Sequence, residues 1–453
     1  MASLAGLLKK KGYDVAGSDQ DIYPPMSDML RTLKIPVFTP YNGFHLKHYK
    51  PDIVVVGNAI GRGNPELEYV ISNGLLPAGR QVLYRSMSDI LQEEFIEQKK
   101  AIVITGTHGK TTTTALVSWM LECAKLDPTV FVGGLAKNFD SSFKLGKGKY
   151  VVIEGDEYDT AFFDKGPKFW HYRPFIGLVN NIELDHIDIY KDLDAIKFAF
   201  GRFINLIPKN GLLVVSRENK NAYNLALKLA KSPVSTFGVN AGNWTAKNIK
   251  YSDQYISFDA HSNGHTISDI RTKLIGKYNI SNILGAITIA KFLKIPDVKI
   301  KEAIKTFEGV KRRQEIIGEK NGIIVIDDYA HHPTAVRLTL DAVRKSFHGK
   351  RFVCVFEPGS ASSKRRVFEK HYIESFKHAD LVYLYKPFKA NSLKRRETFN
   401  GKYVSSQLKK SWNFHDIKPM LLHMKRQFKP GDVVVIMSCR GFDNLYKLIW
   451  DIL

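Results

Sequence analysis

Residues 104–114 read Ile-Thr-Gly-Thr-His-Gly-Lys-Thr-Thr-Thr-Thr and continue the apolar run 101–104. An apolar run that meets glycines indicates a buried strand ending in a tight turn, and the residues from Lys110 onward favour a helix. Such a turn points backbone N–H groups at an anion, and the helix N-terminus adds partial positive charge. Lys110 can reach terminal phosphates, and the Thr111 hydroxyl can bind Mg²⁺.

The spacing differs from the common phosphate-loop pattern, because no glycine stands five residues before Gly109 and Gly106 lies closer. A strand-to-helix turn capped by threonines is the plainer alternative. We favour a nucleoside triphosphate site, because glycines, lysine and threonine all stand in order behind a strand.

The composition is that of a globular protein with several domains. The chain has 453 residues, of which 44% are hydrophobic and 25% charged, which suits about two to four domains with cores of their own. We see no apolar run as long as a membrane span and no secretory signal pattern. The widely spaced Cys123, Cys354 and Cys439 suggest neither a disulfide framework nor a zinc site. We therefore expect a cytoplasmic protein with no membrane partner.

The formal net charge of +22 admits two interpretations. Basic patches are typical of nucleic-acid-binding proteins. The basic clusters 364–366 and 394–396 are short, however, and no nucleic-acid-binding motif accompanies them. We favour a lysine-rich surface that also serves anionic small substrates, and expect no nucleic acid partner. A P-loop ATPase acting on nucleic acid is the alternative from a different functional class.

Strand and helix patterns alternate along three stretches of the chain, which predicts an α/β fold throughout. The predicted domains are 1–99, 100–309 and 310–453, and the first contains a helix over 3–11. The predicted strands are 13–17, 53–57 and 82–85 in the first domain, 102–105, 150–153, 176–180 and 212–216 in the second, and 323–326, 352–356, 381–384 and 433–437 in the third.

Acidic residues follow the predicted strand 150–153, at the edge where open parallel sheets bind ligands. Residues 154–159 read Glu-Gly-Asp-Glu-Tyr-Asp. A row of carboxylates in the same domain as the phosphate loop can hold Mg²⁺, which prefers oxygen ligands. A solvated acidic loop is the alternative, and the position after a strand favours the metal.

Histidines follow two further strands. Asp185, His186 and Asp188 come after 176–180, and His186 is either a metal ligand or a buried histidine with satisfied hydrogen bonds. We favour the ligand, because acidic residues flank it. Residues 327–333 read Asp-Asp-Tyr-Ala-His-His-Pro after the third domain's first strand. Buried acids and histidines are costly unless they bind something, so we predict a site closed by domain movement.

Together these segments resemble the Mur ligase family, which uses ATP to add amino acids to a UDP-linked peptidoglycan precursor. The family pattern Thr-Gly-Thr-x-Gly-Lys-Thr-Thr matches residues 105–112. The family's acidic strand end and Asp-His pair match 154–159 and 185–186. Its asparagine motif resembles 276–282, although Tyr278 stands where histidine is usual. Its Asp-Asp-Tyr-x-His-His-Pro segment, typical of the alanine-adding branch, matches 327–333, and its junction arginine resembles Arg313.

The resemblance implies an amide-forming ligase that works through an acyl phosphate. It implies three domains: a Rossmann-like UDP-binding domain, a P-loop ATPase-like central domain and a Rossmann-like peptide-binding domain. ATP and Mg²⁺ would be the cofactors, and the protein would be a monomer or weak homodimer.

The resemblance also implies residue roles. The implied catalytic residues are Lys110, His186 and Arg313, and the implied Mg²⁺ ligands are Thr111, Glu154 and His186. The implied nucleotide-binding residues are Gly106, Thr107, His108, Gly109, Lys110, Thr111, Thr112, Asn279, Asn282, Arg313, Asp327 and His331. The implied substrate-binding residues are Asp19, Asn58, Asn64, Asp156, Glu157 and His332.

Within the family, one branch matches best: it joins the tripeptide L-alanyl-γ-D-glutamyl-meso-diaminopimelate to UDP-N-acetylmuramate in peptidoglycan recycling. The matching segments are 22–27, 57–59, 62–66, 157–165, 171–174 and 180–186. The branch that adds alanine is the first alternative, and folate polyglutamate ligases are a more distant one.

The chain departs from the family pattern at several places. Gly155 replaces an alanine, and Gly359 replaces an arginine usual near the peptide site. The family's first strand and glycine-rich turn are missing before Met1, and we expect the natural protein to begin upstream with them.

Overall fold

The computed structural model describes residues 1–22, 24, 26–73, 75–76, 80–81, 83–252, 255–390, 393–394 and 396–453. These residues divide into two compact units. The first unit comprises Met1–Glu183, Leu193–Trp244 and Gly285–Ala303, and the second comprises Leu184–Asp192, Thr245–Leu284 and Ile304–Leu453.

A seven-stranded sheet forms the centre of the first unit. Its strands, in spatial order, are β15 (Val234–Phe237), β14 (Leu212–Ser216), β13 (Pro174–Val179), β7 (Lys100–Thr105), β10 (Tyr150–Glu154), β8 (Thr129–Ala136) and β9 (Ser141–Lys144). All neighbours are parallel except β8 and β9. The inner strands are almost wholly buried, which explains their continuous apolar sequences.

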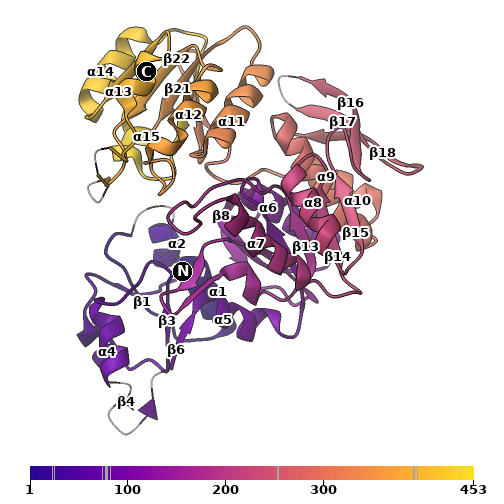
Figure 1. The fold of residues 1–453 in the computed structure, drawn as a ribbon, viewed down its shortest axis with the longest axis vertical. Coiled ribbons are helices and arrows are strands. Elements are labelled where there is room, and N and C mark those ends of the chain that lie inside the picture. Colours follow the sequence, from indigo (N-terminus) through magenta and orange to yellow (C-terminus); the bar gives the residue numbers. More distant parts are fainter. Residues whose placement is uncertain are drawn as a thin grey trace. The chain divides into compact units, whose positions relative to one another are not determined.

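Helices cover this central sheet (Figure 1). Helix α6 (Lys110–Cys123) packs on β7, β8 and β10, and α8 (Lys220–Leu229) packs on β14 and on α7 (Leu193–Asn205). A small antiparallel pair, β11 (Asp159–Ala161) and β12 (Asp164–Pro167), follows β10.

The N-terminal part of the first unit contains short parallel strand pairs. Strand β1 (Gly17–Ser18) pairs with β2 (Val37–Phe38), and β3 (Ile53–Val56) pairs with β6 (Leu83–Ser86). The antiparallel pair is β4 (Leu75–Leu76) with β5 (Arg80–Gln81), and the helices are α1 (Ala2–Lys11), α2 (Met26–Thr32), α3 (Gly43–Tyr49), α4 (Pro65–Asn73) and α5 (Met87–Leu91).

The predicted strand over 13–17 is wrong. Residues 13–16 have no regular structure, and the strand begins only at Gly17. The reason lies in the end of α1: Gly12 adopts φ 103°, and the Tyr13 N–H donates to the Leu8 carbonyl at 3.1 Å. This left-handed cap uses the residues that the apolar pattern assigned to a strand. The predicted helix 3–11 and strand 53–57 are present with shifted ends. The predicted strand 82–85 is present as β6 over its described residues; Val82 lies outside them.

A six-stranded sheet forms the core of the second unit, and its two faces carry separate hydrophobic clusters. In spatial order the strands are β19 (Glu315–Lys320), β20 (Ile323–Asp328), β24 (Asp432–Met437), β21 (Arg351–Phe356), β22 (Leu381–Tyr385) and β23 (Ser411–Phe414). Only β19 is antiparallel to its neighbour. Successive residues such as Cys354 and Val355 join opposite clusters, as strand geometry requires.

Helices α11 (Pro333–Ser346), α12 (Glu369–Phe376) and α13 (Gly401–Ser406) contribute to one cluster. Helices α14 (Ile417–Gln427) and α15 (Leu445–Leu448) contribute to the other. The strands predicted for the second and third domains are all present, with ends shifted by a residue or two.

One sheet of the second unit was not predicted. Strands β16 (Thr245–Tyr251), β17 (Ile256–Ser262) and β18 (His265–Thr272) form an antiparallel meander. Helices α9 (Lys277–Phe292) and α10 (Asp297–Thr306) follow it and contain the division between the units. The remaining elements are a π-helix, η1 (Gln92–Ile96), and the 3-10 helices η2 (Lys137–Phe139), η3 (Lys168–His171), η4 (Arg366–Phe368), η5 (Phe442–Asn444) and η6 (Ile449–Asp451).

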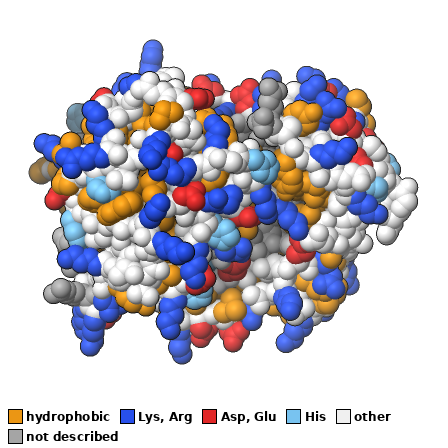
Figure 2. All heavy atoms as spheres, turned by 90° about the horizontal axis from the view of Figure 1, so that it is seen from above, with side chains coloured by type: hydrophobic (Ala, Val, Ile, Leu, Met, Phe, Trp, Pro, Cys, Tyr) orange, Lys and Arg blue, Asp and Glu red, His pale blue; other side chains and the backbone are white. Residues whose placement is uncertain are grey.

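Among the described helices, none is long and apolar enough to cross a membrane. Cys123, Cys354 and Cys439 are free. On the face shown in Figure 2, Lys and Arg side chains lie scattered among acidic, apolar and uncharged ones.

Candidate active site

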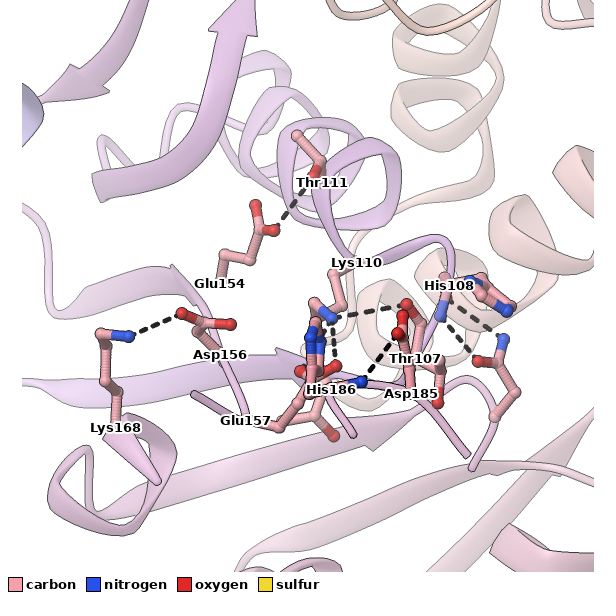
Figure 3. A network of polar contacts seen from close by, with 12 residues as sticks. Thr107, His108, Lys110, Thr111, Glu154, Asp156, Glu157, Lys168, Asp185 and His186 are labelled. Carbon is pink, nitrogen blue, oxygen red and sulfur yellow. Dashed lines mark hydrogen bonds and ion pairs between the residues drawn. The ribbon is translucent and has the colours of Figure 1, made fainter. Parts of the chain in front are cut away.

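The phosphate loop connects β7 to α6 in the first unit (Figure 3). Gly106 has φ 130° and Gly109 has φ 82°, both in the region that favours glycine. A Cβ on Gly106 would lie 2.9 Å from the Asn180 Cβ and 3.0 Å from the Asn181 nitrogen. Only glycine therefore fits at residue 106, where the loop passes close to the end of β13. The loop ends at the N-terminus of a fourteen-residue helix, which is a favourable place for phosphates.

Asn181 holds this loop from the neighbouring strand end. Its side-chain oxygen accepts the His108 N–H at 2.7 Å, and its amide group donates to the His108 carbonyl at 3.2 Å. The Thr107 N–H donates to the Asn181 carbonyl at 3.0 Å, and the Glu183 N–H donates to the Thr107 hydroxyl at 2.9 Å. These bonds fix the loop before any ligand binds, so little ordering remains for an anion to impose.

Lys110 points to a carboxylate in this structure. Its Nζ lies 2.8 and 2.7 Å from the two carboxylate oxygens of Glu157, whose side chain is 2% exposed. Burial by itself lowers the pKa of Lys110, but Glu157, together with Asp156 and Glu154, outweighs burial and raises it. Lys110 is thus a fixed cation at the start of α6.

Glu154 and Asp156 of the acidic segment also have defined partners. The Thr111 hydroxyl donates to Glu154 Oε1 at 3.0 Å, and the Gly133 N–H donates to Glu154 Oε2 at 2.7 Å. Lys168, whose side chain is 6% exposed, donates to Asp156 Oδ2 at 2.7 Å. The structure therefore brings Lys110, Thr111 and all three acids of residues 154–157 to one end of the central sheet, as Figure 3 shows. Thr112 is buried in the first turn of α6.

The three N-terminal substrate candidates occupy loops after short strands and before a helix. Asp19 is exposed after β1, and its Oδ1 accepts the Gln20 N–H at 2.7 Å. Asn58 is exposed in the turn after β3. Asn64 Oδ1 accepts the N–H groups of Glu66 and Leu67 at 3.0 and 3.2 Å. Asn64 thus caps α4, a structural use that the sequence analysis did not foresee.

The second unit contains the Asp-His pair and the two C-terminal histidines. Asp185 is buried, and its Oδ1 accepts the His186 N–H at 2.7 Å. Burial raises the pKa of Asp185, but the charges of His186, His331 and His332 outweigh it and hold the pKa well below its usual range. His186 has φ 52°, in the left-handed region that only a few per cent of non-glycine residues adopt.

His331 and His332 each make a backbone contact. His331 Nδ1 donates to the Tyr329 carbonyl at 3.0 Å, and burial lowers the His331 pKa to about 4, although Asp185 opposes this. The His332 side chain accepts the Thr334 N–H at 3.3 Å through Nδ1 and so caps α11, while Nε2 lies 3.2 Å from the Leu184 carbonyl. A carbonyl can only accept, so Nε2 is the donor in this contact.

The aspartates at the end of β20 differ in environment. Asp328 accepts the N–H groups of Gln314 and Ala330, each at 2.7 Å. Asp327 pairs with Arg312 at 3.2 Å, and its buried Oδ1 has no hydrogen-bond partner among the described residues. Burial raises the pKa of Asp327 to about 6, although Arg312 opposes the shift. A buried oxygen such as Asp327 Oδ1, with no hydrogen-bond partner among the described residues, is suited to accept a hydrogen bond from a ligand hydroxyl.

The remaining nucleotide candidates lie near this strand end in the same unit. Asn279 donates to the Gln314 side chain at 3.0 Å, and Asn282 donates to Asn279 at 3.0 Å. The Arg313 guanidinium lies 4.3 Å from the Tyr329 ring centroid, which is cation–π geometry.

Protein-family models match the segments of the chain that contain these residues. The Mur ligase middle domain matches residues 104–290, the glutamate ligase domain of Mur ligases matches 312–440, and the Mur ligase catalytic domain matches 1–89. The UDP-N-acetylmuramate--L-alanyl-gamma-D-glutamyl-meso-2,6-diaminoheptandioate ligase of Haemophilus influenzae is 34% identical over 100% of this chain and 96% of its own. The chain belongs to the Mur ligase family.

Other Mur ligases are similarly close. The UDP-N-acetylmuramate--L-alanine ligase of Clostridium acetobutylicum is 35% identical over 99% of this chain and 94% of its own. The crystal structure of a murein peptide ligase from Psychrobacter arcticus superimposes with a TM-score of 0.75 at 31% identity, covering 100% of this chain and 96% of that one. This Mur ligase therefore has the family's three-domain α/β architecture and is an ATP-dependent amide ligase of peptidoglycan synthesis.

Sequence reasoning missed several residues of this Mur ligase. Asn181 lies in the segment 180–186 that the sequence analysis named, but its role in holding the phosphate loop depends on pairing between β7 and β13. Lys168 meets Asp156 only because the β11–β12 pair turns the chain back. Glu357, at the end of β21, is 1% exposed and accepts the Ser438 hydroxyl at 2.5 Å. Burial raises the pKa of Glu357 to about 6. A carboxylate straight after an apolar strand was the available signal.

Proposed function

We propose that this Mur ligase joins the tripeptide L-alanyl-γ-D-glutamyl-meso-diaminopimelate to UDP-N-acetylmuramate, through an acyl phosphate, in peptidoglycan recycling. Relatives named for the tripeptide and relatives named for alanine are about equally similar to it. Overall identity therefore does not choose between the two amine donors, and the choice rests on local features.

The observation that carries the proposal is the resemblance of residues 157–165 and 171–174, within the segment 157–174, to the tripeptide-adding branch. In this chain the segment forms β11, β12 and η3 directly after the acidic strand end. It places Glu157 on Lys110 and Lys168 on Asp156. A segment that both matches the peptide branch and builds the phosphate-loop surroundings favours the larger amine donor.

The proposed reaction begins with the lactyl carboxylate of UDP-N-acetylmuramate attacking the γ-phosphate of ATP, so that the acyl phosphate forms and ADP leaves. Lys110, the N–H groups of the phosphate loop and Arg313 stabilise the negative charge that spreads over the transferred oxygens. The peptide's ammonium group then gives up a proton, and the resulting amine attacks the carbonyl carbon of the acyl phosphate. The new C–N bond forms, the C–O bond to the phosphate breaks, the nitrogen loses a second proton, and inorganic phosphate leaves. Asp327, His331 and His332 hold the ribose, phosphates or peptide, and Asn279 and Asn282 meet the adenine. Asp19, Asn58 and Asn64 line the UDP-sugar pocket.

The donor set of Thr111 and Glu154 fits Mg²⁺. Their oxygens already meet at 3.0 Å, and both are hard ligands of the kind this ion prefers. We propose that Thr111, Glu154 and His186 hold Mg²⁺, which would neutralise charge on the β- and γ-phosphates.

We also propose domain limits of 1–99, 100–309 and 310–453, supported by family matches over 1–89, 104–290 and 312–440. Three free cysteines support a reducing, cytoplasmic setting. We propose that the enzyme acts as a monomer or weak homodimer.

Phosphate release tests the proposed function. ATP and UDP-N-acetylmuramate are supplied with either alanine or the tripeptide, and inorganic phosphate is measured. We expect release that requires UDP-N-acetylmuramate and is much faster with the tripeptide. Faster release with alanine would assign the chain to the alanine-adding branch, whose members are also close relatives.

Magnesium titration of the same assay tests the metal site. Glu154→Gln removes a charged ligand but keeps the shape, so the Mg²⁺ concentration for half-maximal rate should rise at least about tenfold. The matched control is Glu218→Gln, a carboxylate that accepts backbone N–H groups of residues 239 and 240 away from the phosphate loop. An equal Mg²⁺ requirement in Glu154→Gln and the control would remove Glu154 from the ligand set.

A further inference from the structure

The phosphate-loop lysine carries out a second interaction that its role in phosphate binding does not require. Lys110 Nζ contacts both oxygens of Glu157, at 2.8 and 2.7 Å, in the symmetric geometry of a fully engaged ion pair. The Glu157 side chain is 2% exposed and that of Lys110 is 13% exposed, so the pair is shielded from water. Charge-assisted bonds of this kind are strong.

The neighbouring carboxylates are held by other groups. Glu154 accepts the Thr111 hydroxyl and the Gly133 N–H, and Asp156 accepts Lys168. In these hydrogen bonds Thr111 and Gly133 donate to Glu154, Lys168 donates to Asp156, and Lys110 donates to Glu157. Figure 3 shows this division, with Lys110 turned toward Glu157 and Lys168 toward Asp156.

ATP must disturb the Lys110–Glu157 pair. Terminal phosphates attract the lysine of a phosphate loop, and a triphosphate carries more charge than one carboxylate. When Lys110 turns to the phosphates, Glu157 loses two charge-assisted hydrogen bonds while its side chain remains largely shielded from water. A buried carboxylate in that position is strongly stabilised by a new cation with N–H donors.

The reaction supplies such a cation. A peptide amine arrives in water as an ammonium group, with one positive charge and three N–H donors, the same charge and donors as the lysine head group. We propose that the Lys110–Glu157 pair is a cation-exchange device, in which ATP withdraws Lys110 and Glu157 then binds the ammonium group of the incoming peptide. This inference rests on the proposed function, because it needs an amine donor.

The device orders the binding events. Without nucleotide, Lys110 blocks the ammonium site, so the peptide binds weakly. With nucleotide bound, Lys110 contacts the phosphates, and the ammonium site on Glu157 becomes available. Glu157 is a binding residue in this scheme, and its contribution lies in the affinity for the amine.

The first test separates acyl phosphate formation from amine binding. Hydroxylamine, which is mostly uncharged at neutral pH, traps the acyl phosphate as a hydroxamate without needing an ammonium site. We expect Glu157→Gln to raise the KM for the tripeptide at least about tenfold, and the hydroxamate rate of each protein is measured alongside as the reference for acyl phosphate formation. Glu157→Asp, which keeps the charge, should recover part of the lost affinity.

The outcomes distinguish the two levels of the proposal. An unchanged tripeptide KM in Glu157→Gln, with hydroxamate formed normally, would overturn the cation exchange and leave the proposed function intact. Loss of hydroxamate in Glu157→Gln with an unchanged KM would also overturn it and make Glu157 a positioning residue for Lys110. No hydroxamate from the natural protein would refute the proposed function itself.

A second variant tests the same idea without altering Glu157. Lys110→Ala removes the blocking cation, so this variant should bind the tripeptide in calorimetry without nucleotide, at least about tenfold more tightly than the nucleotide-free natural protein. The N-acetylated tripeptide, which has no ammonium group, is the matched probe and should show no such gain. Equal binding of the tripeptide by both nucleotide-free proteins would overturn the inference.

Discussion

At the scale of single residues, charge placement decides what the phosphate-loop end of the central sheet can do. Lys110 donates to Glu157, the Thr111 hydroxyl donates to Glu154, and Lys168 donates to Asp156. These acids are close together in the sequence, and from that clustering we predicted oxygen ligands for a metal. It could not assign partners, because the pairing depends on how β11 and β12 return Lys168 to Asp156.

Lys110→Ala should lower the ligase rate by about a thousandfold, the scale of a lost contact to developing charge. The fold should survive, because α6 keeps its buried apolar residues. Phosphate release measures the effect, and Lys209→Ala, at an exposed turn of the same unit, is the control. Near-normal turnover in Lys110→Ala would show that the loop does not bind the transferred phosphate.

Glu357→Gln should change the pH dependence of stability. The folded-state pKa of Glu357 is about 6 and its ordinary value is 4.5, so between these values the folded protein binds more protons than the unfolded one. The protonated Glu357 carboxyl therefore stabilises the folded protein at low pH. This contribution, about 2 kcal/mol, is lost as the pH rises from 4.5 through about 6. The free energy of unfolding of Glu357→Gln, relative to the natural protein, should rise by that amount from about pH 4 to about pH 7.5.

Urea unfolding at the two pH values measures this difference. Glu374→Gln is the control, because that side chain is 67% exposed on α12 of the same unit. A difference between Glu357→Gln and the natural protein that does not change with pH would show that the Glu357 carboxyl titrates as in the unfolded chain.

At the scale of elements, the conformation of the phosphate loop depends on its close contact with the end of β13. The sequence predicted the strand, the turn and the helix, because apolar residues, glycines and threonines each have one strong local preference. It did not predict that Asn180 and Asn181 would limit residue 106 to glycine, since that contact joins strands far apart in the sequence. The meander β16–β18 was missed for a similar reason: its polar, half-exposed strands lack the continuous apolar runs of the central sheet.

Gly106→Ala should distort the phosphate loop. The new Cβ would lie within 3.1 Å of Asn180 and Asn181, at a φ of 130° that alanine rarely adopts. We expect nucleotide affinity to fall at least about tenfold, since the loop's N–H groups would move away from the phosphates. Gly61→Ala, with nothing within 4 Å of the new Cβ, is the control. Fluorescent-nucleotide titration that gave equal affinities for both variants would contradict the account.

At the scale of the whole molecule, two units each place polar side chains at the ends of parallel strands. Their strands could be predicted because buried parallel strands are continuous apolar runs. The strand predicted over 13–17 failed because the cap of α1 uses those residues. The substrate roles of Asp19, Asn58, Asn64 and His332 stay predictions, and the caps formed by Asn64 and His332 show a structural use for these two side chains.

A direct competition between amine donors tests the central claim. The enzyme is given ATP, Mg²⁺, UDP-N-acetylmuramate and equal concentrations of alanine and the tripeptide, and the products are identified by mass. The account predicts that the UDP-N-acetylmuramoyl-tripeptide accumulates in large excess. Predominance of UDP-N-acetylmuramoyl-alanine would contradict it.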